Sequence, residues 1–307
     1  MRVAFLGTPE FALPVLQTLI DRGDTIAVFT QPDRPVGRKA ILTPPPVKVL
    51  AQSHGIPVFQ FEKIRSAEGV AALSAFAPDL AVTAAFGQLL SADNLAIPKF
   101  GTINVHGSLL PKYRGASPIQ TAILNGDTMT GVTTMFTDIG MDTGDILLKK
   151  EIAIDPDDTS ETLSKKLSEA GALLLKETLS RLEAGTLVRI PQNNDEASKC
   201  RLIRKEDGKL DFSKTTQQVH NRVRAMNPWP VSFASLDGQP LKFFETQLCD
   251  LAPDALPIGT LKVMQKKLYV RCADGYLEIR SLQCPGKKRM AAESYLCGCD
   301  LGGKQLL

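Results

Sequence analysis

The sequence predicts an α/β protein: a Rossmann-like, mostly parallel sheet with helices on both faces, followed by a small C-terminal β-barrel of the OB-like kind. Three observations predict it. Apolar runs of strand length alternate with amphipathic helical stretches up to about residue 189. Five short strands with little helix follow residue 212. The 307 residues suffice for two domains, and 43% hydrophobic with 22% charged residues is typical of a globular chain.

The start of the chain predicts a β-α-β unit, which favours a parallel sheet. Residues 2–6 and 25–30 are apolar runs, and residues 11–22 repeat apolar side chains at helical spacing until Gly23 ends the helix. The turn at residues 7–11 lacks the second and third glycines of a dinucleotide fingerprint. We therefore expect a Rossmann-like fold without nicotinamide or flavin binding.

The same patterns place the other elements of the larger domain. Helices are expected over residues 47–53, 67–76, 118–125 and 159–183, and strands over residues 56–59, 80–85, 103–105, 131–137 and 146–154. Residues 190–198 are polar and show no apolar period. We therefore expect a first domain over residues 1–189 and an interdomain linker over residues 190–211.

The remaining residues, 212–307, predict the barrel domain. After a helix over residues 216–225, short strands are expected over residues 231–236, 241–248, 259–263, 268–273 and 276–281. Residues 1–198 carry 18 Lys and Arg against 22 Asp and Glu, whereas residues 199–307 carry 18 against 11. A basic last third indicates a polyanionic partner, and on charge alone a solvated basic surface is an equally good interpretation.

Features that the sequence lacks bear on its compartment and on metal binding. No apolar run approaches the ~20 residues that span a bilayer, and the first residues show no secretory pattern. We expect a cytoplasmic protein without membrane contact and, since nothing demands more, a monomer. All six cysteines lie in the last third, and Cys297 and Cys299 are spaced too tightly for a zinc pair, so no metal site is expected.

The stretch over residues 101–111 carries the first candidate catalytic groups. Asn104 and His106 are two apart on an apolar, β-branched strand, so their side chains share one side of it. Asp142, in a turn with glycines on both sides, is expected at the same carboxyl edge of the sheet. Amide and imidazole donors suit an oxyanion, and a carboxylate suits an ammonium proton. The three together fit an amine attacking an acyl or formyl carbonyl, whereas a lone histidine would more often be a core residue.

No nucleophile accompanies these residues. Ser108 lacks the nucleophile-elbow pattern, and no cysteine lies in this half of the chain. Direct transfer between two bound substrates, through a tetrahedral intermediate, is therefore favoured over a covalent acyl-enzyme.

A basic, proline-rich loop over residues 31–48 follows a predicted strand directly. It holds five prolines together with Arg34, Arg38, Lys39 and Lys48. Because it should leave from the carboxyl edge of the sheet, where doubly wound folds bind ligands, we expect it to grip an anionic substrate. A mobile surface loop is the alternative.

These motifs carry a family resemblance. Residues 104–111, Asn-Val-His-Gly-Ser-Leu-Leu-Pro, and the turn at residues 140–145 resemble the signatures of folate-dependent formyltransferases. The loop at residues 29–38 and Asn-Pro-Trp-Pro at residues 227–230 narrow the resemblance to the family members that act on methionyl-tRNA. The resemblance implies transfer of the formyl group of 10-formyltetrahydrofolate to the amino group of methionyl initiator tRNA, by a catalytic first domain and a tRNA-binding barrel.

The resemblance also implies roles for single residues. Asn104 and His106 would polarise the formyl group and hold the oxyanion, while Asp142 would relay the proton of the amine and fix the imidazole. The folate pocket would be lined by Ser108, Leu109, Leu110, Pro111, Phe86, Gly87, Gln88, Leu89 and Leu90. Phosphate contacts, and hence salt-dependent binding, would come from Arg34, Arg38, Lys39, Lys242, Lys266, Lys267, Lys287, Lys288 and Arg289.

Two other functions fit parts of the pattern. A nucleotide-sugar amine formyltransferase would use the same three residues but would need neither a basic loop nor a basic barrel. A non-catalytic RNA-binding protein with a degenerate enzyme domain would explain the charge, but the intact Asn104, His106 and Asp142 argue against it.

Overall fold

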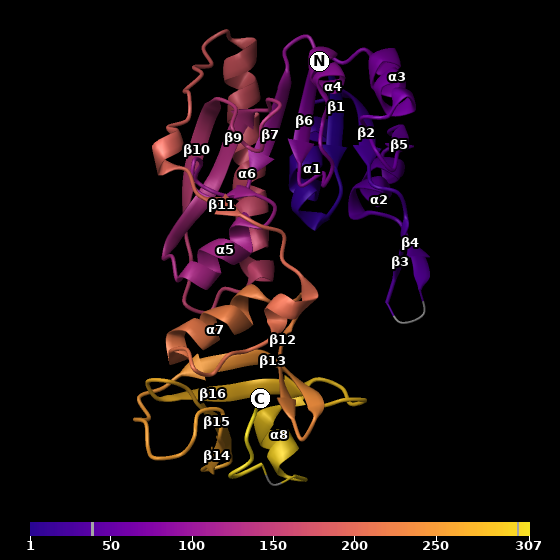
Figure 1. Cartoon of the computed structure of the whole chain (residues 1–307). Coiled ribbons are helices and arrows are strands. Elements are labelled where there is room, and N and C mark those ends of the chain that lie inside the picture. The colour runs from indigo at the N-terminus through magenta and orange to yellow at the C-terminus, as the bar shows by residue number, and fades with distance from the viewer. Residues whose placement is uncertain (38–39, 300) are drawn as a thin grey trace. The chain divides into compact units, whose positions relative to one another are not determined.

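The computed structural model of the chain describes residues 1–37, 40–299 and 301–307 (Figure 1). These residues form two compact units. The first unit comprises Met1–Pro118, Met129–Ala153 and Ser164–Cys200, and the second comprises Ile119–Thr128, Ile154–Leu163 and Arg201–Leu307. None of the helices within the described ranges is long and apolar enough to cross a membrane.

The first unit is built on a seven-stranded sheet with the strand order β10-β9-β7-β6-β1-β2-β5. Five neighbouring strands, β7, β6, β1, β2 and β5, run parallel, and β9 and β10 add two antiparallel strands at one edge. The predicted mostly parallel sheet is thereby confirmed. The strand bounds are β1 Arg2–Gly7, β2 Thr25–Thr30, β5 Val58–Gln60, β6 Leu80–Ala84, β7 Thr102–His106, β9 Met129–Phe136 and β10 Ile146–Ala153.

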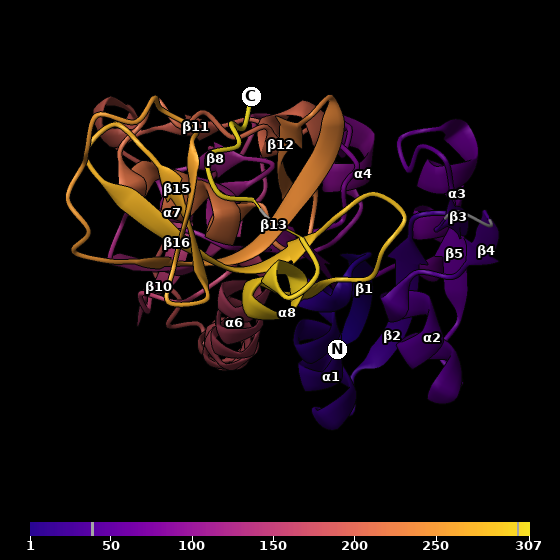
Figure 2. The ribbon, with the colours of Figure 1, turned by 90° about the horizontal axis from the view of Figure 1, so that it is seen from below.

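Both faces of this sheet are covered, because its central strands are apolar at consecutive positions. In β1, Val3 and Phe5 pack with α1, α2 and α6, whereas Ala4 and Leu6 pack in a second cluster with α3. Figure 2 shows α1 and α6 on one side of β1 and β2, and α3 and α4 on the other. The helix bounds are α1 Leu13–Asp21 after the 3-10 turn Glu10–Ala12, α2 Pro46–Ser53, α3 Ala67–Phe76, α4 Ala92–Ala96 and α6 Ser160–Glu183.

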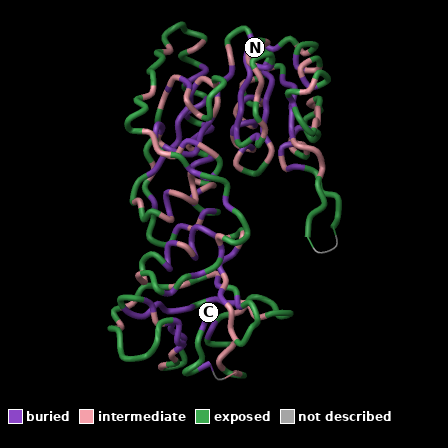
Figure 3. The backbone as a smooth tube through the Cα atoms, viewed as in Figure 1, coloured by how far each residue is buried: buried purple, intermediate pink, exposed green. Residues whose placement is uncertain are grey.

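Two short ribbons complete the first unit. β3 Arg34–Val36 pairs with β4 Ile41–Thr43 inside the proline-rich loop, and the burial colours of Figure 3 show this ribbon as exposed. β8 Arg114–Gly115 pairs in parallel with β11 Lys199–Cys200, which follows the 3-10 turn Asn194–Glu196. Residues 190–200, in the range expected to be a linker, therefore belong to the first unit.

The second unit contains an antiparallel sheet with the order β12-β13-β16-β15-β14, with β17 paired to β16. The five strands predicted after residue 230 are present, with ends shifted by up to two residues. The bounds are α5 Pro118–Asn125, a 3-10 turn Lys205–Gly208, α7 Thr216–Ala225, β12 Ser232–Leu236, β13 Gln239–Leu248, β14 Leu261–Met264, β15 Lys267–Arg271, β16 Tyr276–Gln283, β17 Met290–Ala291 and α8 Ala292–Leu296.

The edge strands of this sheet, β12 and β14, are bridged by the last residues of the chain rather than by a strand ladder. Leu307 exchanges two backbone hydrogen bonds with Ser235 in β12, at 2.7 and 2.9 Å. On the other side, Leu261 in β14 donates to the carbonyl of Lys304 at 2.7 Å and accepts from Gly303 at 2.9 Å. The strands of the sheet therefore do not close into a barrel by themselves. Residues 303–307 connect its two edge strands, β12 and β14, and this arrangement is consistent with an OB-like barrel.

A buried histidine in α7 makes the stability of the second unit depend on pH. His220 is 5% exposed, and its Nδ1 lies 2.8 Å from Thr246 Oγ1. Burial, followed by the nearby Arg224 guanidinium, lowers the pKa of His220 to about 4. The unfolded chain, with a pKa of ~6.5 for histidine, therefore takes up this proton first.

We predict that the unfolding free energy of the wild-type chain falls as the pH drops from about 6.5 to about 4, by up to ~1.4 kcal/mol per pH unit from this group. His220→Gln should flatten that slope in urea denaturation followed by circular dichroism. His54→Gln, which changes an exposed histidine, is the matched control and should leave the slope as it is. An equally steep slope in His220→Gln would contradict the prediction.

Candidate active site

The last residues of β7 carry the amide and the imidazole. Asn104 Oδ1 accepts a hydrogen bond of 2.8 Å from Thr83 Oγ1, in the neighbouring strand β6. This contact fixes the orientation of the amide, so its NH2 group is the end that can donate to a ligand. The sequence suggested Asn104 as a donor, and Thr83, which orients it, is a partner that the sequence alone did not indicate.

The ring of His106 is also oriented by a neighbour. Its Nε2 lies 3.0 Å from the carbonyl oxygen of Tyr113. Because a carbonyl oxygen only accepts, Nε2 carries the hydrogen, and Nδ1 is the ring nitrogen left for proton exchange. Nδ1 faces Asp142, whose Oδ2 lies 3.8 Å away. This separation exceeds hydrogen-bond length, so the two groups face each other without a direct hydrogen bond.

Asp142 reaches this position by a route that differs from the expected one. β9 runs antiparallel to β7 and pairs Phe136 with Ile103, so the turn after β9 begins at the amino end of β7 and not at the carboxyl edge. The turn then folds back, and Gly115 N–H donates 2.8 Å to Asp142 Oδ2. The carboxylate therefore meets His106 at the carboxyl end of β7, although its strand ends at the other side.

The glycine two residues after Asp142 is required by the backbone of the turn. A Cβ atom on Gly144 would lie 1.8 Å from the carbonyl oxygen of Phe136. The glycine thus allows the two ends of the turn to pass close to each other. Asp142 itself has φ +54°, in the left-handed region that few side chains adopt without support.

The residues predicted to line a folate pocket divide into buried and exposed ones. Ser108, Leu110 and Phe86 are buried, and the Ser108 hydroxyl donates 2.6 Å to the carbonyl of Lys112, which leaves it unsuited to act as a nucleophile. Gln88 is occupied in holding the segment before α3, since its Oε1 accepts 2.6 Å from the Ile64 amide. Pro111 is also buried, whereas Leu89 is 64% exposed, Gly87 is exposed, and Leu109 and Leu90 are half-buried.

The basic loop is pinned at its base. Lys48 Nζ lies 2.8 Å from Asp33, and Gln60 also donates to this carboxylate at 2.7 Å. The hydrogen bonds from Gln60 and Lys48 lower the pKa of Asp33 below its ordinary value. Lys48 is thus a structural cation. Arg34 is 56% exposed and pairs with Glu62 at 2.6 Å, and the predicted contacts Arg38 and Lys39 lie outside the described residues.

The basic residues predicted in the second unit form two groups along its sheet. Lys242 pairs in register with Gln283, whose amide donates 2.8 Å to the carbonyl of Lys287. Lys267, in β15, lies 3.4 Å from Glu278, which is in β16 as Gln283 is. Along β16, Glu278 and Gln283 are five residues apart, which corresponds to roughly 17 Å. The first group comprises Lys242, Lys287, Lys288 and Arg289, and the second Lys266 and Lys267; all six are exposed, and Arg289 also pairs with Glu245.

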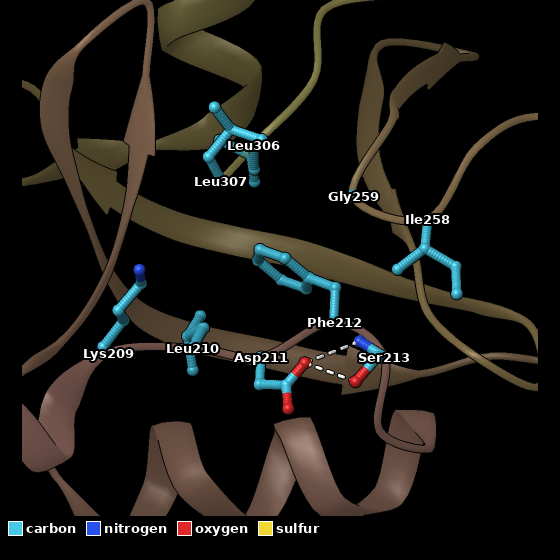
Figure 4. A pocket seen from close by; sticks show the side chains of 9 residues that line it. All are labelled: Lys209, Leu210, Asp211, Phe212, Ser213, Ile258, Gly259, Leu306 and Leu307. Carbon is cyan, nitrogen blue, oxygen red and sulfur yellow. Dashed lines mark hydrogen bonds between the residues drawn. The ribbon is translucent and has the colours of Figure 1, made fainter.

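A cavity of about 480 Å³ in the second unit contains none of the predicted site residues. Figure 4 shows its walls, where Phe212, Ile258 and Leu306 supply apolar surface and Asp211 is held to Ser213. None of the six cysteines, all of which the structure describes, forms a disulfide. Within the described ranges, no three His, Cys, Asp or Glu side chains are grouped as metal ligands would be.

Two family models match this chain, and together they cover most of its length. The formyl transferase family model matches residues 1–179, and the formyl transferase C-terminal domain model matches residues 202–300. A protein named methionyl-tRNA formyltransferase from Geotalea uraniireducens is 48% identical over 308 residues, 100% of this chain and 98% of that one. A protein of the same name from Ruminiclostridium cellulolyticum is 47% identical over 309 residues, 99% of each chain.

Solved structures share the fold at much lower identity. A sugar 3N-formyl transferase, crystallised in the presence of dTDP and 5-N-formyl-THF, has a TM-score of 0.68 at 21% identity over 94% of this chain and 99% of that one. The N-formyltransferase from Helicobacter canadensis, in complex with folinic acid and dTDP-3-aminofucose, has a TM-score of 0.65 at 22% identity over 90% and 97%. Because the family model spans more than half of the sequence and the relatives match over its full length, this chain belongs to the formyl transferase family.

Proposed function

We propose that the chain transfers the formyl group of 10-formyltetrahydrofolate to the amino group of methionyl initiator tRNA. The observation that carries this proposal is the combination of an intact Asn104, His106 and Asp142 site with full-length relatives, 46–48% identical, that are named methionyl-tRNA formyltransferase. The solved sugar formyltransferases are only 21–22% identical to this chain. A nucleotide-sugar acceptor therefore has weaker support than methionyl-tRNA.

The site residues divide the work of a direct transfer. The amine nitrogen attacks the formyl carbon, and the Asn104 NH2 group donates to the oxyanion that forms. Asp142 takes the proton of the resulting ammonium, directly or through one water. A protonated His106 Nδ1 can donate to the same oxyanion while the carboxylate beside it balances the imidazolium charge. Collapse of the tetrahedral intermediate then breaks the bond from the formyl carbon to the folate nitrogen, and that nitrogen takes up the proton that Asp142 accepted from the amine, directly or through one water.

Folate binding is proposed at the turns after β6 and β7. The exposed Leu89 and half-buried Leu109 offer apolar surface, and Gly87, with φ +77°, presents backbone that a side chain does not cover. The buried Ser108, Leu110, Pro111 and Phe86 would shape this wall through their backbone. Two solved formyltransferases of the same fold were crystallised with formyl-THF or folinic acid, which supports the proposal for this chain.

The tRNA is proposed to contact the basic loop and the two basic groups of the second unit, since exposed lysines and arginines bind phosphates. We also propose residues 1–189 as the catalytic domain, residues 190–211 as a linker whose first part, residues 190–200, is packed on the first unit, and residues 212–307 as the tRNA-binding domain, in a monomeric cytoplasmic protein. The family-model matches to residues 1–179 and 202–300 are compatible with that division.

The acceptor is tested by supplying 10-formyltetrahydrofolate with either methionyl initiator tRNA or a UDP-amino-sugar and measuring formylated product by mass spectrometry. We predict formyl transfer to the tRNA and none above background to the sugar. Transfer to the sugar alone would refute the tRNA proposal, and no transfer to either acceptor would favour a non-catalytic RNA-binding protein.

The catalytic roles are tested with His106→Ala and Asp142→Asn. Each should lower kcat by about 10²- to 10⁴-fold, because each removes a donor or a proton acceptor at the reacting centre. Single-turnover assays would measure the chemical step, and urea denaturation would measure folding. His54→Ala, a change at an exposed histidine, serves as the control. A near-wild-type kcat in either site variant would overturn its assigned role.

Phosphate binding by the second unit is tested by the double change Lys287→Ala and Lys288→Ala. The slope of log Kd for tRNA against log salt concentration should fall by about 0.7 to 0.9 for each phosphate that the variant no longer neutralises. Fluorescence anisotropy at several salt concentrations measures it. Lys150→Ala, an exposed lysine on the edge strand β10 outside the proposed contacts, should leave the slope as it is. An unchanged slope in the double variant would remove these lysines from the interface.

A further inference from the structure

One glutamine from the segment after α6 reaches the turn that carries Asp142. Gln192 Nε2 donates to the carbonyl of Asp142 at 2.9 Å and to the carbonyl of Gly144 at 2.8 Å. Its Oε1 accepts 3.0 Å from Arg114 Nε. A single side chain thereby ties two carbonyls of the turn to the strand β8.

Arg114 is an unusual anchor for this glutamine. It is 6% exposed, and its Nη2 has no hydrogen-bond partner among the described residues. Burying a guanidinium that lacks some of its hydrogen bonds costs folding free energy, so a structural reason for burying Arg114 is expected. The bond from Nε to Gln192 supplies one, because it sets which end of the glutamine amide points at the turn.

The same segment also holds the backbone groups that orient the catalytic side chains. The Tyr113 amide donates 2.9 Å to Ser198 Oγ, and the Arg114 amide donates 2.8 Å to the Ser198 carbonyl. Tyr113 supplies the carbonyl that accepts from His106, and Gly115 supplies the amide that donates to Asp142. Residues 192–200 therefore support both partners of the pair.

Gln192 contacts the turn at Asp142, whose backbone conformation needs support from its surroundings. Asp142 is not a glycine, yet it has φ +54°, a conformation that persists only where surrounding contacts enforce it. The carbonyls of Asp142 and Gly144 flank that conformation, and Gln192 holds both. Without the two donated bonds, the turn can relax toward ordinary backbone angles, which moves the carboxylate away from His106.

We propose that Gln192, anchored by Arg114, is a positioning residue for formyl transfer: it fixes the Asp142 turn so that the carboxylate faces His106 Nδ1. The inference rests on the proposed function, because it assigns Asp142 its role as proton acceptor there. Gln192 does not touch the reacting atoms in this assignment. It acts on the chemical step through Asp142.

The test compares Gln192→Glu with Gln192→Leu. Glutamate has nearly the same shape and can still accept from Arg114, but it cannot donate to the two carbonyls. We expect both variants to lower kcat by about 10- to 100-fold, with a much smaller change in KM for either substrate, as a misplaced catalytic group does. Gln52→Glu, the same change at an exposed glutamine of α2, is the matched control and should keep the wild-type kcat.

Two further readouts separate positioning from a loss of stability. The pH dependence of kcat should shift in Gln192→Glu relative to wild type, because the carboxylate no longer faces His106 as before. The Gly115 amide, which donates to Asp142, should change its ¹H–¹⁵N chemical shift in Gln192→Glu in the direction seen in Asp142→Asn. This second measurement needs no substrate.

The outcomes distinguish this inference from the function on which it rests. If the wild-type chain forms no product, the proposed function fails, while the Gly115 shift still reports on the turn. If the wild type is active and Gln192→Glu keeps its kcat, its pH profile and the Gly115 shift, the positioning role is wrong. A variant that loses activity only in proportion to its unfolded fraction would also refute it.

Discussion

The site depends on one spatial constraint, which is that the Asp142 carboxylate lies opposite His106 Nδ1, at 3.8 Å, although its turn leaves β9 at the other end of β7. Both side chains are oriented by the same three residues of backbone, since Tyr113 accepts from the imidazole and Gly115 donates to the carboxylate. Any displacement of that short stretch would move both partners. The proposed mechanism of formyl transfer needs the two side chains together, so it requires this stretch to be held rigidly.

That support comes from residues that follow the long helix α6. β11 lies along β8, and the approach is so close that a Cβ atom on Gly115 would lie 2.2 Å from the carbonyl oxygen of Cys200. Ser198 and Gln192 add side-chain contacts to the same stretch and to the turn. A polar segment without apolar periodicity therefore has a structural role, because its hydrogen bonds replace the packing that an amphipathic element would provide.

Several of the basic side chains that could bind phosphate already pair with carboxylates of the protein. Lys48 is used to pin the proline-rich loop, and Arg34 and Arg289 have carboxylate partners in Glu62 and Glu245. The exposed pairs are worth ~0 to 1 kcal/mol each, so a phosphate can replace the carboxylate at little cost. Lys287 and Lys288, which are exposed, fit the phosphate-binding proposal more simply.

The sequence by itself determined the alternation of strands and helices, the two-part organisation and the three catalytic candidates, because hydrophobic period, turn residues and local motifs are written in adjacent residues. Helices such as Ala67–Phe76 and Thr216–Ala225 were predicted to the residue. Only the tertiary structure decided that β9 is antiparallel to β7, that Gly144 serves the turn's own backbone, and that Gln192 and Thr83 orient site groups. Gln192 and Asp142 lie 50 residues apart, and no local pattern encodes which distant polar group satisfies a buried carbonyl.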